Sequence, residues 1–219
     1  MLHKTYAVQG LFTGKKETLP NGQESAIRKK PTQTLILKSH RIQDDTVVDQ
    51  RFHGGDMRVL HHYSEKNYQH LKKKFPEIAE RFIPGSFGEN LYTNELSEND
   101  LCIGDIFNLG SAKIQLTVPR RPCATLNNSY EDKRILKEVI NCGHVGWFYR
   151  ILEEGEVKIS DHLTALERPF PNLKITKLFE QGYGKEKFKD LGFLKACYET
   201  GLMDKGWKPK LEKVLKILT

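Results

Sequence analysis

The feature that most constrains the fold is a strand that ends at a proline, in residues 113–123. Ile114, Leu116 and Val118 alternate there with polar residues, which is the period-two pattern of a half-buried β-strand. Pro119 has no backbone N–H to offer a neighbouring strand, so we expect the strand to end there. The sequence therefore predicts a sheet strand that delivers a stiff, proline-containing loop to its end.

This loop carries a cysteine beside two arginines. Arg120 and Arg121 follow the strand, and Pro122 separates them from Cys123. Guanidinium groups close to a thiol favour the thiolate, which attacks electrophiles and binds soft metals. The alternative is that Cys123 is a small buried side chain, as most free cysteines are. Both interpretations stay open on this stretch alone.

Two glycine-containing segments add a second kind of signal. Gly54 and Gly55 lie between His53 and Arg58, and Asn90 is the last polar residue of the segment 85–91. Paired glycines let a backbone approach a bulky or anionic group, and successive N–H groups in such a turn can bind an anion. Taken alone, a glycine pair is more often just a turn.

In their order along the chain, these segments resemble the MOSC domain, a family named after the C-terminal part of molybdenum cofactor sulfurases. The resemblance covers most of residues 10–170, and it is strongest to the stand-alone bacterial subgroup linked to resistance against N-hydroxylated bases such as hydroxylaminopurine. The motifs that carry it are Ser25-Ala26-Ile27 with Lys30-Pro31, His53-Gly54-Gly55 with Arg58, Gly88-Glu89-Asn90-Leu91, Gly104-Asp105, Pro119-Arg120, Pro122-Cys123, Gly143 with Gly146-Trp147, and Glu167-Arg168-Pro169.

The chain departs from the family pattern at Asp44, Asp56, Met57 and Thr125. Thr125 stands where a lysine is frequent, two residues after the cysteine. Without this lysine we expect weaker binding of a phosphate group, unless Arg121 or Arg28 compensates.

The resemblance implies a molybdenum cofactor (molybdopterin) and an oxidoreductase that reduces small N-hydroxylated compounds to amines. It also implies that Cys123 is the molybdenum ligand and the catalytic residue. The cofactor-binding residues it implies are Ser25, Arg28, His53, Gly54, Gly55, Arg58, Asn90, Arg120 and Trp147. The sequence has no flavin, haem or iron–sulfur motif, so we expect a separate flavin-type reductase as electron donor.

Two other function classes stay open. The chain could be a non-catalytic carrier or sensor of the molybdenum cofactor, or a sulfur-handling protein. A third and weaker hypothesis is a basic structural or nucleic-acid-binding module. We expect no nucleic acid partner, because no recognition motif accompanies the basic residues.

Composition limits the remaining possibilities. The 219 residues suffice for one substantial domain with a small appendage. Cys102, Cys142 and Cys197 lie far from one another and from Cys123, with no C-x-x-C and no histidine-rich spacing. This spacing argues against a zinc site and a disulfide scaffold, and it fits a reducing cytoplasm. The N-terminal residues contain no apolar run, so we expect no signal peptide and no membrane span.

Periodicity predicts a mainly β, MOSC-type barrel with inserted helices. The clearest strands are expected at 34–37, 103–109, 112–118 and 155–159. Helices are expected after Ser64 as N-cap, from Pro76, and over 132–140. His61 and His62 lie in an apolar, strand-like setting, which favours a core position or support of a neighbouring ligand. Trp147 is interpreted either as a stacking platform for a planar ligand or as core.

A helical appendage is predicted beyond Pro169. The barrel domain is expected over 1–168 and the appendage over 169–219, with helices at 173–181, 188–200 and 209–218. From Arg168 to Thr219 the chain has twelve Lys or Arg against six Asp or Glu, which is +6 of the net +7. In its last helix, Leu211, Val214, Leu215 and Leu218 form an apolar stripe opposite lysines. We expect a surface outside the pocket that docks an acidic partner or a second copy of the chain.

Overall fold

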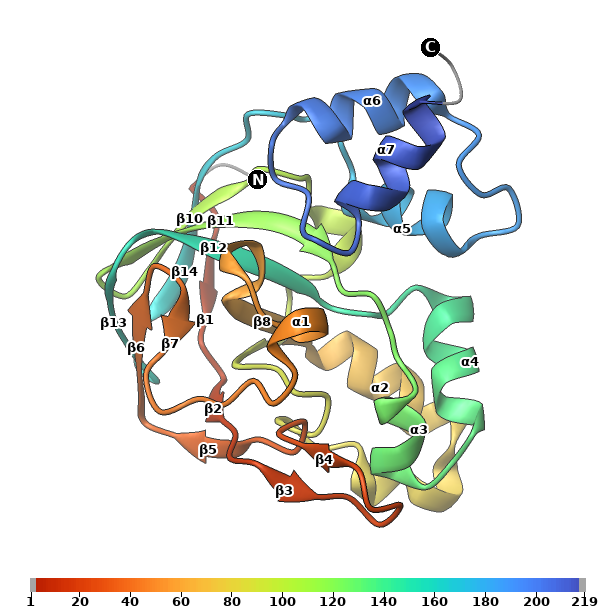
Figure 1. Ribbon diagram of the computed structural model, residues 1–219. Helices are drawn as coiled ribbons and strands as arrows, with labels where there is room; N and C mark the ends of the chain where they lie inside the picture. Colours follow the sequence, from red (N-terminus) through yellow and green to blue (C-terminus); the bar gives the residue numbers. More distant parts are fainter. Residues whose placement is uncertain (1–2, 217–219) are drawn as a thin grey trace.

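A nine-stranded sheet that curls into an open half-barrel dominates the computed structural model, which describes residues 3–216 (Figure 1). Neighbouring strands are antiparallel except β8 and β9, which run parallel. The strand order is β1 (Thr5–Ala7), β14 (His162–Glu167), β10 (Ile106–Leu109), β11 (Ala112–Pro119), β12 (Trp147–Glu153), β8 (Leu60–Ser64), β9 (Leu91–Thr93), β2 (Gly10–Thr13) and β5 (Lys30–Thr32).

Two small sheets and several helices complete the barrel part. One sheet consists of β13 (Gly155–Lys158), β6 (Thr34–Lys38) and β7 (Arg41–Ile42), and the other of β3 (Glu17–Thr18) and β4 (Glu24–Ser25). The inserted helices are α1 (Gln50–His53), α2 (Glu65–Lys74), α3 (Thr125–Tyr130) and α4 (Arg134–Cys142). Three 3₁₀ turns accompany them, η1 (Asp56–Arg58), η2 (Pro76–Arg81) and η3 (Glu98–Asp100).

Three helices follow the barrel and gather at one end of the molecule (Figure 1). They are α5 (Ile175–Tyr183), α6 (Leu191–Glu199) and α7 (Lys208–Lys216). Within residues 3–216, no helix combines the length and the apolar character that a membrane span requires. The predicted fold class, a mainly β MOSC-type barrel with inserted helices and a three-helix C-terminal appendage, is confirmed.

Local signals located most elements to within a few residues. Ser64 is the N-cap of α2, and its side chain accepts a hydrogen bond from the Lys66 amide. The strand expected at 103–109 begins only at Ile106, because Gly104 adopts a positive φ of 85° and turns the chain. Leu218 lies outside the described residues, so the last apolar stripe is seen only as far as Leu215.

The strand expected to be half-buried is almost completely buried. The side chains of Gln115 and Thr117 were predicted to face solvent, yet they are 7% and 0% exposed. Thr117 Oγ1 donates to Met57 O at 2.6 Å, and Gln115 Nε2 donates to Gly104 O at 3.1 Å. The prediction was wrong because η1 and the appendage cover this face, and hydrogen bonds compensate the polar groups for lost water.

The apolar residues of α5–α7 belong to the same core as the barrel strands. Leu178, Leu194 and Trp207 are 0% exposed, and they form one cluster with residues of β10 and β11. Trp207 Nε1 also donates to Pro119 O at 3.2 Å. Helices this short cannot build a core alone, and here they complete the core of the barrel. The boundary at 168–169 stays a prediction.

Replacing Trp207 by Ala should therefore destabilise the whole chain. We expect a loss of about 3–5 kcal/mol in the free energy of unfolding, because a large buried side chain leaves a cavity between barrel and appendage. Urea unfolding followed by circular dichroism measures the loss. Leu152→Ala, at a side chain that is 39% exposed, is the control and should stay within about 0.5 kcal/mol of the parent. A barrel signal that unfolds in W207A at the parent's urea concentration would contradict a shared core.

Candidate functional site

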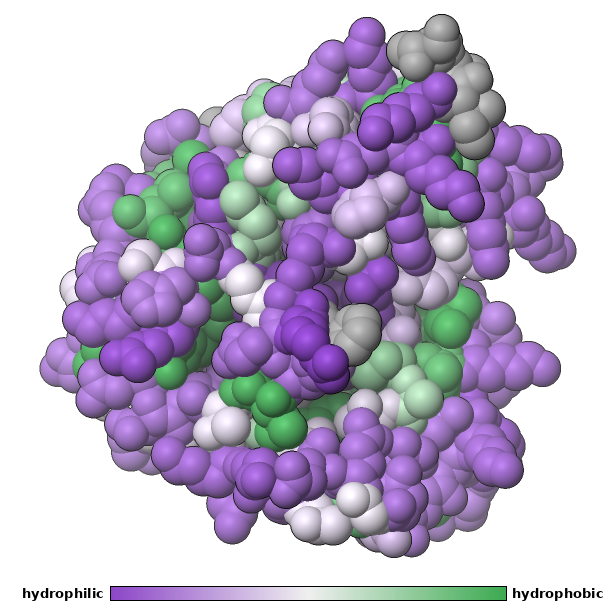
Figure 2. Space-filling model, in the orientation of Figure 1, coloured by the Kyte–Doolittle hydropathy of each residue, from purple (hydrophilic) through white to green (hydrophobic). Residues whose placement is uncertain are grey.

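A cavity of about 700 Å³ opens beside the curled sheet. Its walls come from the β4 segment, the stretch leading through α1, the 85–91 loop, and the loop that follows β11. Its lining contains the basic side chains of Lys29, Arg51, Arg58 and Arg120 and the acidic ones of Glu24, Asp45 and Asp49. Phe87 and Phe148 contribute aromatic surface. The face shown in Figure 2 is largely hydrophilic, with smaller hydrophobic patches between.

The glycine pair determines where α1 ends and η1 begins. Gly55 has a φ of 116°, which favours glycine, and a Cβ on Gly54 would lie 2.0 Å from Gln50 Oε1. Asp49 is the N-cap of α1. The tight turn brings Arg58, at the end of η1, to the wall of the cavity. The glycines thus shape the backbone, and neither lines the cavity.

A buried carboxylate ties another wall together. Asp45 forms an ion pair with Lys29, and their side chains are 6% and 7% exposed. Asp45 also accepts hydrogen bonds from Asn90 Nδ2 at 2.8 Å and from the Gly14 amide at 2.7 Å. Burial lowers the pKa of Lys29 from its ordinary value, and the charge of Asp45 opposes this shift. The pair therefore holds the wall with little net charge.

The 85–91 loop is organised by a second buried carboxylate. Glu89 accepts hydrogen bonds from the Gly85 amide and the Tyr68 hydroxyl, both at 2.6 Å. Burial raises the pKa of Glu89, and these hydrogen bonds oppose the rise. The loop thereby presents the Phe87 carbonyl, which accepts from Arg120 Nη1 at 2.8 Å.

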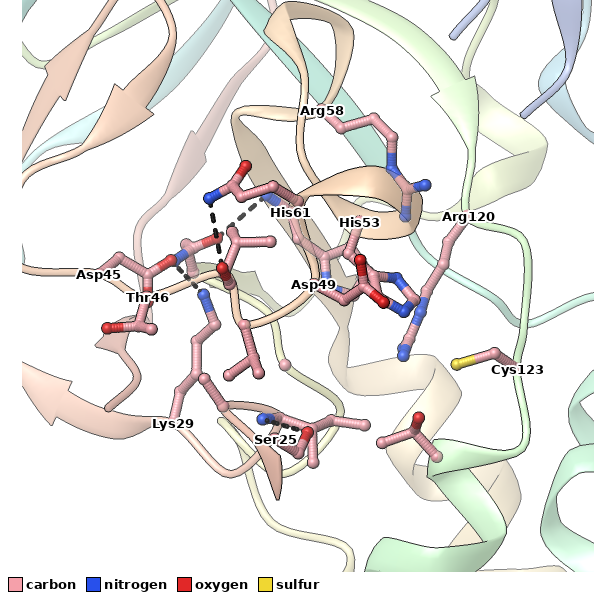
Figure 3. Close-up of a pocket in the computed structure, with 18 of the residues that line it drawn as sticks. Ser25, Lys29, Asp45, Thr46, Asp49, His53, Arg58, His61, Arg120 and Cys123 are labelled. Atoms are coloured by element: carbon pink, nitrogen blue, oxygen red, sulfur yellow. Dashed lines mark hydrogen bonds and ion pairs between the residues drawn. The ribbon is translucent and has the colours of Figure 1, made fainter. Parts of the chain in front are cut away.

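Arg120 and Cys123 occupy the opposite side of the cavity (Figure 3). Arg120 is 8% exposed, and among residues 3–216 it makes no ion pair with a carboxylate. The Cys123 thiol is half-buried, and in Figure 3 its sulfur points into the space that Arg120 also enters. Thr125 continues this wall, where its hydroxyl accepts from Gln23 Nε2 at 3.0 Å. A thiol and an uncompensated cation therefore share one side of the cavity.

The appendage contacts the cavity from behind. Arg58 Nη1 lies 3.5 Å from Asp204 Oδ2, and both side chains are at most 4% exposed. The Arg58 guanidinium also lies over the Phe148 ring, 4.4 Å from its centroid. Burial lowers the pKa of Arg58 to about 10, with Asp204 opposing, so the guanidinium stays charged at neutral pH. Nearby, Arg121 Nη1 donates to Gly206 O at 3.1 Å.

His53 is held in the neutral form. His53 is exposed at the edge of the cavity, but partial desolvation by the surrounding protein lowers its pKa to about 4, helped by the positive charges of Arg58 and Arg120 and opposed by Asp49. At pH 7 the ring can therefore donate one hydrogen bond and accept another, but it carries no charge.

His61 borders the cavity, whereas its neighbour lies in the core. The His61 ring stacks on Phe148 with centroids 4.8 Å apart, and its buried Nε2 has no hydrogen-bond partner among the described residues. A Cβ on Gly146 would lie 2.8 Å from that nitrogen, so glycine there leaves room for the ring. His62 is 0% exposed and its ring nitrogens bond Tyr149 Oη and Thr93 Oγ1.

Comparison with known proteins assigns the chain to a family. The family model described as the MOSC domain matches residues 49–164. The chain belongs to the MOSC domain family.

Individual relatives agree with this assignment. Protein YiiM of Escherichia coli is 37% identical over 159 residues, which cover 72% of this chain and 71% of that protein. A protein named reductase in Gibberella moniliformis is 32% identical over 69% of this chain, but the match covers only 27% of its own length. The crystal structure of Escherichia coli YiiM superposes with a TM-score of 0.79 and 27% identity, covering 96% of this chain and 92% of that one. The crystal structure of a protein described as hypothetical superposes with a TM-score of 0.83 and 28% identity. The match covers 99% of this chain and 92% of that chain.

The MOSC fold brings together most of the residues that the sequence predicted for the site. Those that line the cavity are Ser25, His53, Arg58, Asn90, Arg120 and Cys123. Gly54 and Gly55 lie just outside it. Trp147 is fully buried and donates from Nε1 to Tyr149 Oη at 2.7 Å, so its ring is part of the core and does not face the cavity.

The two arginines expected to compensate for the missing lysine both turn away. Arg28 borders a separate cavity of about 390 Å³ and donates to Ser129 O, because its side chain extends toward α3. Arg121 packs on the appendage at Gly206. Two other cations line the MOSC cavity, Lys29 and Arg51. Sequence reasoning missed both, although Lys29 directly precedes the Lys30-Pro31 motif.

The neutral state of His53 can be tested by its pH titration. Nuclear magnetic resonance of the ring should give a pKa of about 4 in the folded chain. The unfolded chain takes up this proton near pH 6.5, so the His53 contribution makes the folded state less stable as the pH falls from 6.5 toward 4. Arg120→Gln should raise the pKa, but not fully to 6.5, because the partial desolvation and the charge of Arg58 remain. A midpoint near 6.5 in the parent protein would refute this description of the site.

Proposed function

We propose that this chain binds a molybdenum cofactor through Cys123 and reduces N-hydroxylated compounds, such as hydroxylaminopurine, to amines. A separate flavin-type reductase would supply the electrons. The observation that carries the proposal is a half-buried thiol that opens into the cavity beside Arg120, a buried cation without a described carboxylate partner. Membership of the MOSC family supports a function related to the molybdenum cofactor, and a relative named reductase supports a redox role.

The cavity has the properties that such a cofactor requires. Its volume of about 700 Å³ lies within the range of roughly 300–1,000 Å³ of small-molecule sites. His61 Nε2 is a buried polar atom at its edge with no partner among the described residues. Arg120 is a buried cation that makes no ion pair with a described carboxylate, so it can receive an anionic group such as a phosphate. The residues present therefore fit the group.

Under this proposal, the main residues of the cavity have different roles. The Cys123 thiolate would hold the metal, since thiolates are preferred ligands of soft metal centres. Arg120, with Arg58 near it and Lys29 on the opposite wall, would hold the anionic part of the pterin. When bound, the cofactor would supply two-electron reduction. In the balanced reaction the N–O bond breaks, and two electrons and two protons yield the amine and water. Neutral His53 can hydrogen-bond the substrate hydroxyl without adding charge.

Cys123→Ala should abolish cofactor retention while leaving the fold intact. Its sulfur is the thiol that lines the cavity, and it is not part of the buried core. Protein from a host that makes the cofactor should lose molybdenum and pterin by elemental and pterin analysis. It should also lose hydroxylaminopurine reduction with a small chemical reductant.

The matched control is Cys102→Ala, which removes a buried thiol outside the cavity. It should retain both cofactor and turnover. Molybdenum that stays bound to C123A would remove Cys123 as ligand. Cofactor retention by the parent without any turnover would favour the carrier or sensor function.

The lysine surface of α7 should serve the reductase and not the chemistry. Deleting the appendage cannot test this, because α5–α7 share the barrel core. We therefore expect the double change Lys208→Glu and Lys213→Glu to slow turnover with an acidic flavin-type reductase roughly tenfold at low salt. Turnover with a small chemical reductant should be unchanged, and the difference should shrink at high salt.

Lys66→Glu with Lys73→Glu makes the same charge change on exposed positions of α2. It is the matched control and should leave both rates near the parent values. Equal slowing by both double variants would mean that only net charge matters.

A further inference from the structure

Three side chains with metal-binding chemistry lie together outside the cavity. One ring nitrogen each from His70 and His144, and the sulfur of Cys142, all lie within 4.8 Å of one another. His70 is on α2, Cys142 is the last residue of α4, and His144 is in the loop that follows. All three are half-buried, and none of them lines the cavity that contains Cys123.

The end of α4 creates this cluster. Gly143 has a φ of 73° and closes the helix, and the chain then turns so that His144 lies beside Cys142. The carbonyl of His144 accepts a hydrogen bond from the Tyr63 hydroxyl at 3.1 Å, which anchors the loop to β8. The ligand positions are thus held by the backbone and by the core.

The polar groups of the cluster point to a missing partner. His144 Nδ1 is buried and has no hydrogen-bond partner among the described residues. A buried polar atom without a hydrogen-bond partner destabilises the folded state unless a ligand binds it. The rings of His70 and His144 meet edge to face with centroids 4.9 Å apart. Two imidazoles and a thiol, one from α2 and two from the end of α4, therefore lie close together.

A carboxylate supports one of the imidazoles. Glu138 Oε1 lies 2.8 Å from His70 Nε2, and Glu138 Oε2 lies 3.7 Å from Lys74 Nζ. A carboxylate that hydrogen-bonds an imidazole is the usual support of a metal-binding histidine. Because Glu138 is also engaged by Lys74, we assign it this supporting role.

We propose that His70, Cys142 and His144 bind one zinc ion, and that a water molecule fills the fourth position. Imidazole and thiolate ligands in a tetrahedral arrangement suit zinc, and ligand atoms around it lie roughly 3.5 Å apart. The three side chains therefore need to close by only about 1 Å. Binding would release the thiol proton of Cys142 and join α2 to the loop that leads into β12. The spacing of cysteines and histidines did not predict this site, because His70 is far from the other two in sequence.

Cobalt(II) provides the test, since a thiolate ligand gives it a near-ultraviolet charge-transfer band. Titration of the metal-free, full-length chain should produce this band at one equivalent, and zinc should displace it. The band should disappear in Cys142→Ser and persist in Cys123→Ser, which separates this site from the cavity. Glu138→Gln should weaken the affinity about ten- to a hundredfold, as for other supporting carboxylates.

His70→Gln answers the question if the cysteine variant does not fold, because His70 lies at the surface of α2. Thermal unfolding of each metal-free variant shows whether the fold is kept. A weaker cobalt affinity in H70Q by tenfold or more supports the site. Absence of the band in the parent, its survival in C142S, its loss in C123S, or an unchanged affinity in H70Q would each overturn the proposal.

Discussion

The buried carboxylate of Asp45 is the interaction on which the shape of the cavity most depends. It receives hydrogen bonds or an ion pair from Gly14, Lys29 and Asn90, which belong to three separate segments. Asn90 passes the connection on, since its Oδ1 accepts from the His61 amide at 3.2 Å. A buried acid of this kind is stable only when its partners are all in place. The wall therefore forms as one unit.

The opposite wall depends on the C-terminal appendage in a similar way. Trp207 reaches Pro119, Arg121 reaches Gly206, and Asp204 pairs with Arg58. The loop that carries Cys123 thus begins at a strand end that the appendage covers. An open half-barrel can be stable here because α5–α7 cover apolar strand residues that the sheet alone would leave exposed. This arrangement also makes the appendage part of the site's support, although none of its described side chains lines the cavity.

Local signals in the sequence were enough to predict the strand end, the glycine turns and the position of Cys123. Each of these depends on backbone conformations that particular residues demand, such as the positive φ at Gly55. Lys29 and His61 could not be recognised in the same way, because long-range contacts direct them to the cavity. Lys29 is placed by the pairing of β5 with β2 and by its ion pair with Asp45, and His61 by the pairing of β8 with β9. Trp147 was ambiguous, since a large aromatic ring satisfies the pattern of a core residue and of a stacking platform equally well.

The ion pairs around the cavity have a consequence for its shape. Lys29 and Arg58 already have the carboxylates of Asp45 and Asp204, so the repulsion that would open an empty cationic site is largely cancelled. Arg120 is held by the Phe87 carbonyl without a counter-charge from the described residues. The cavity walls therefore keep their positions without a bound ligand. The shape of the cavity is thus fixed by the chain's own ion pairs and hydrogen bonds, and Arg120 stays in its lining without a carboxylate partner among the described residues.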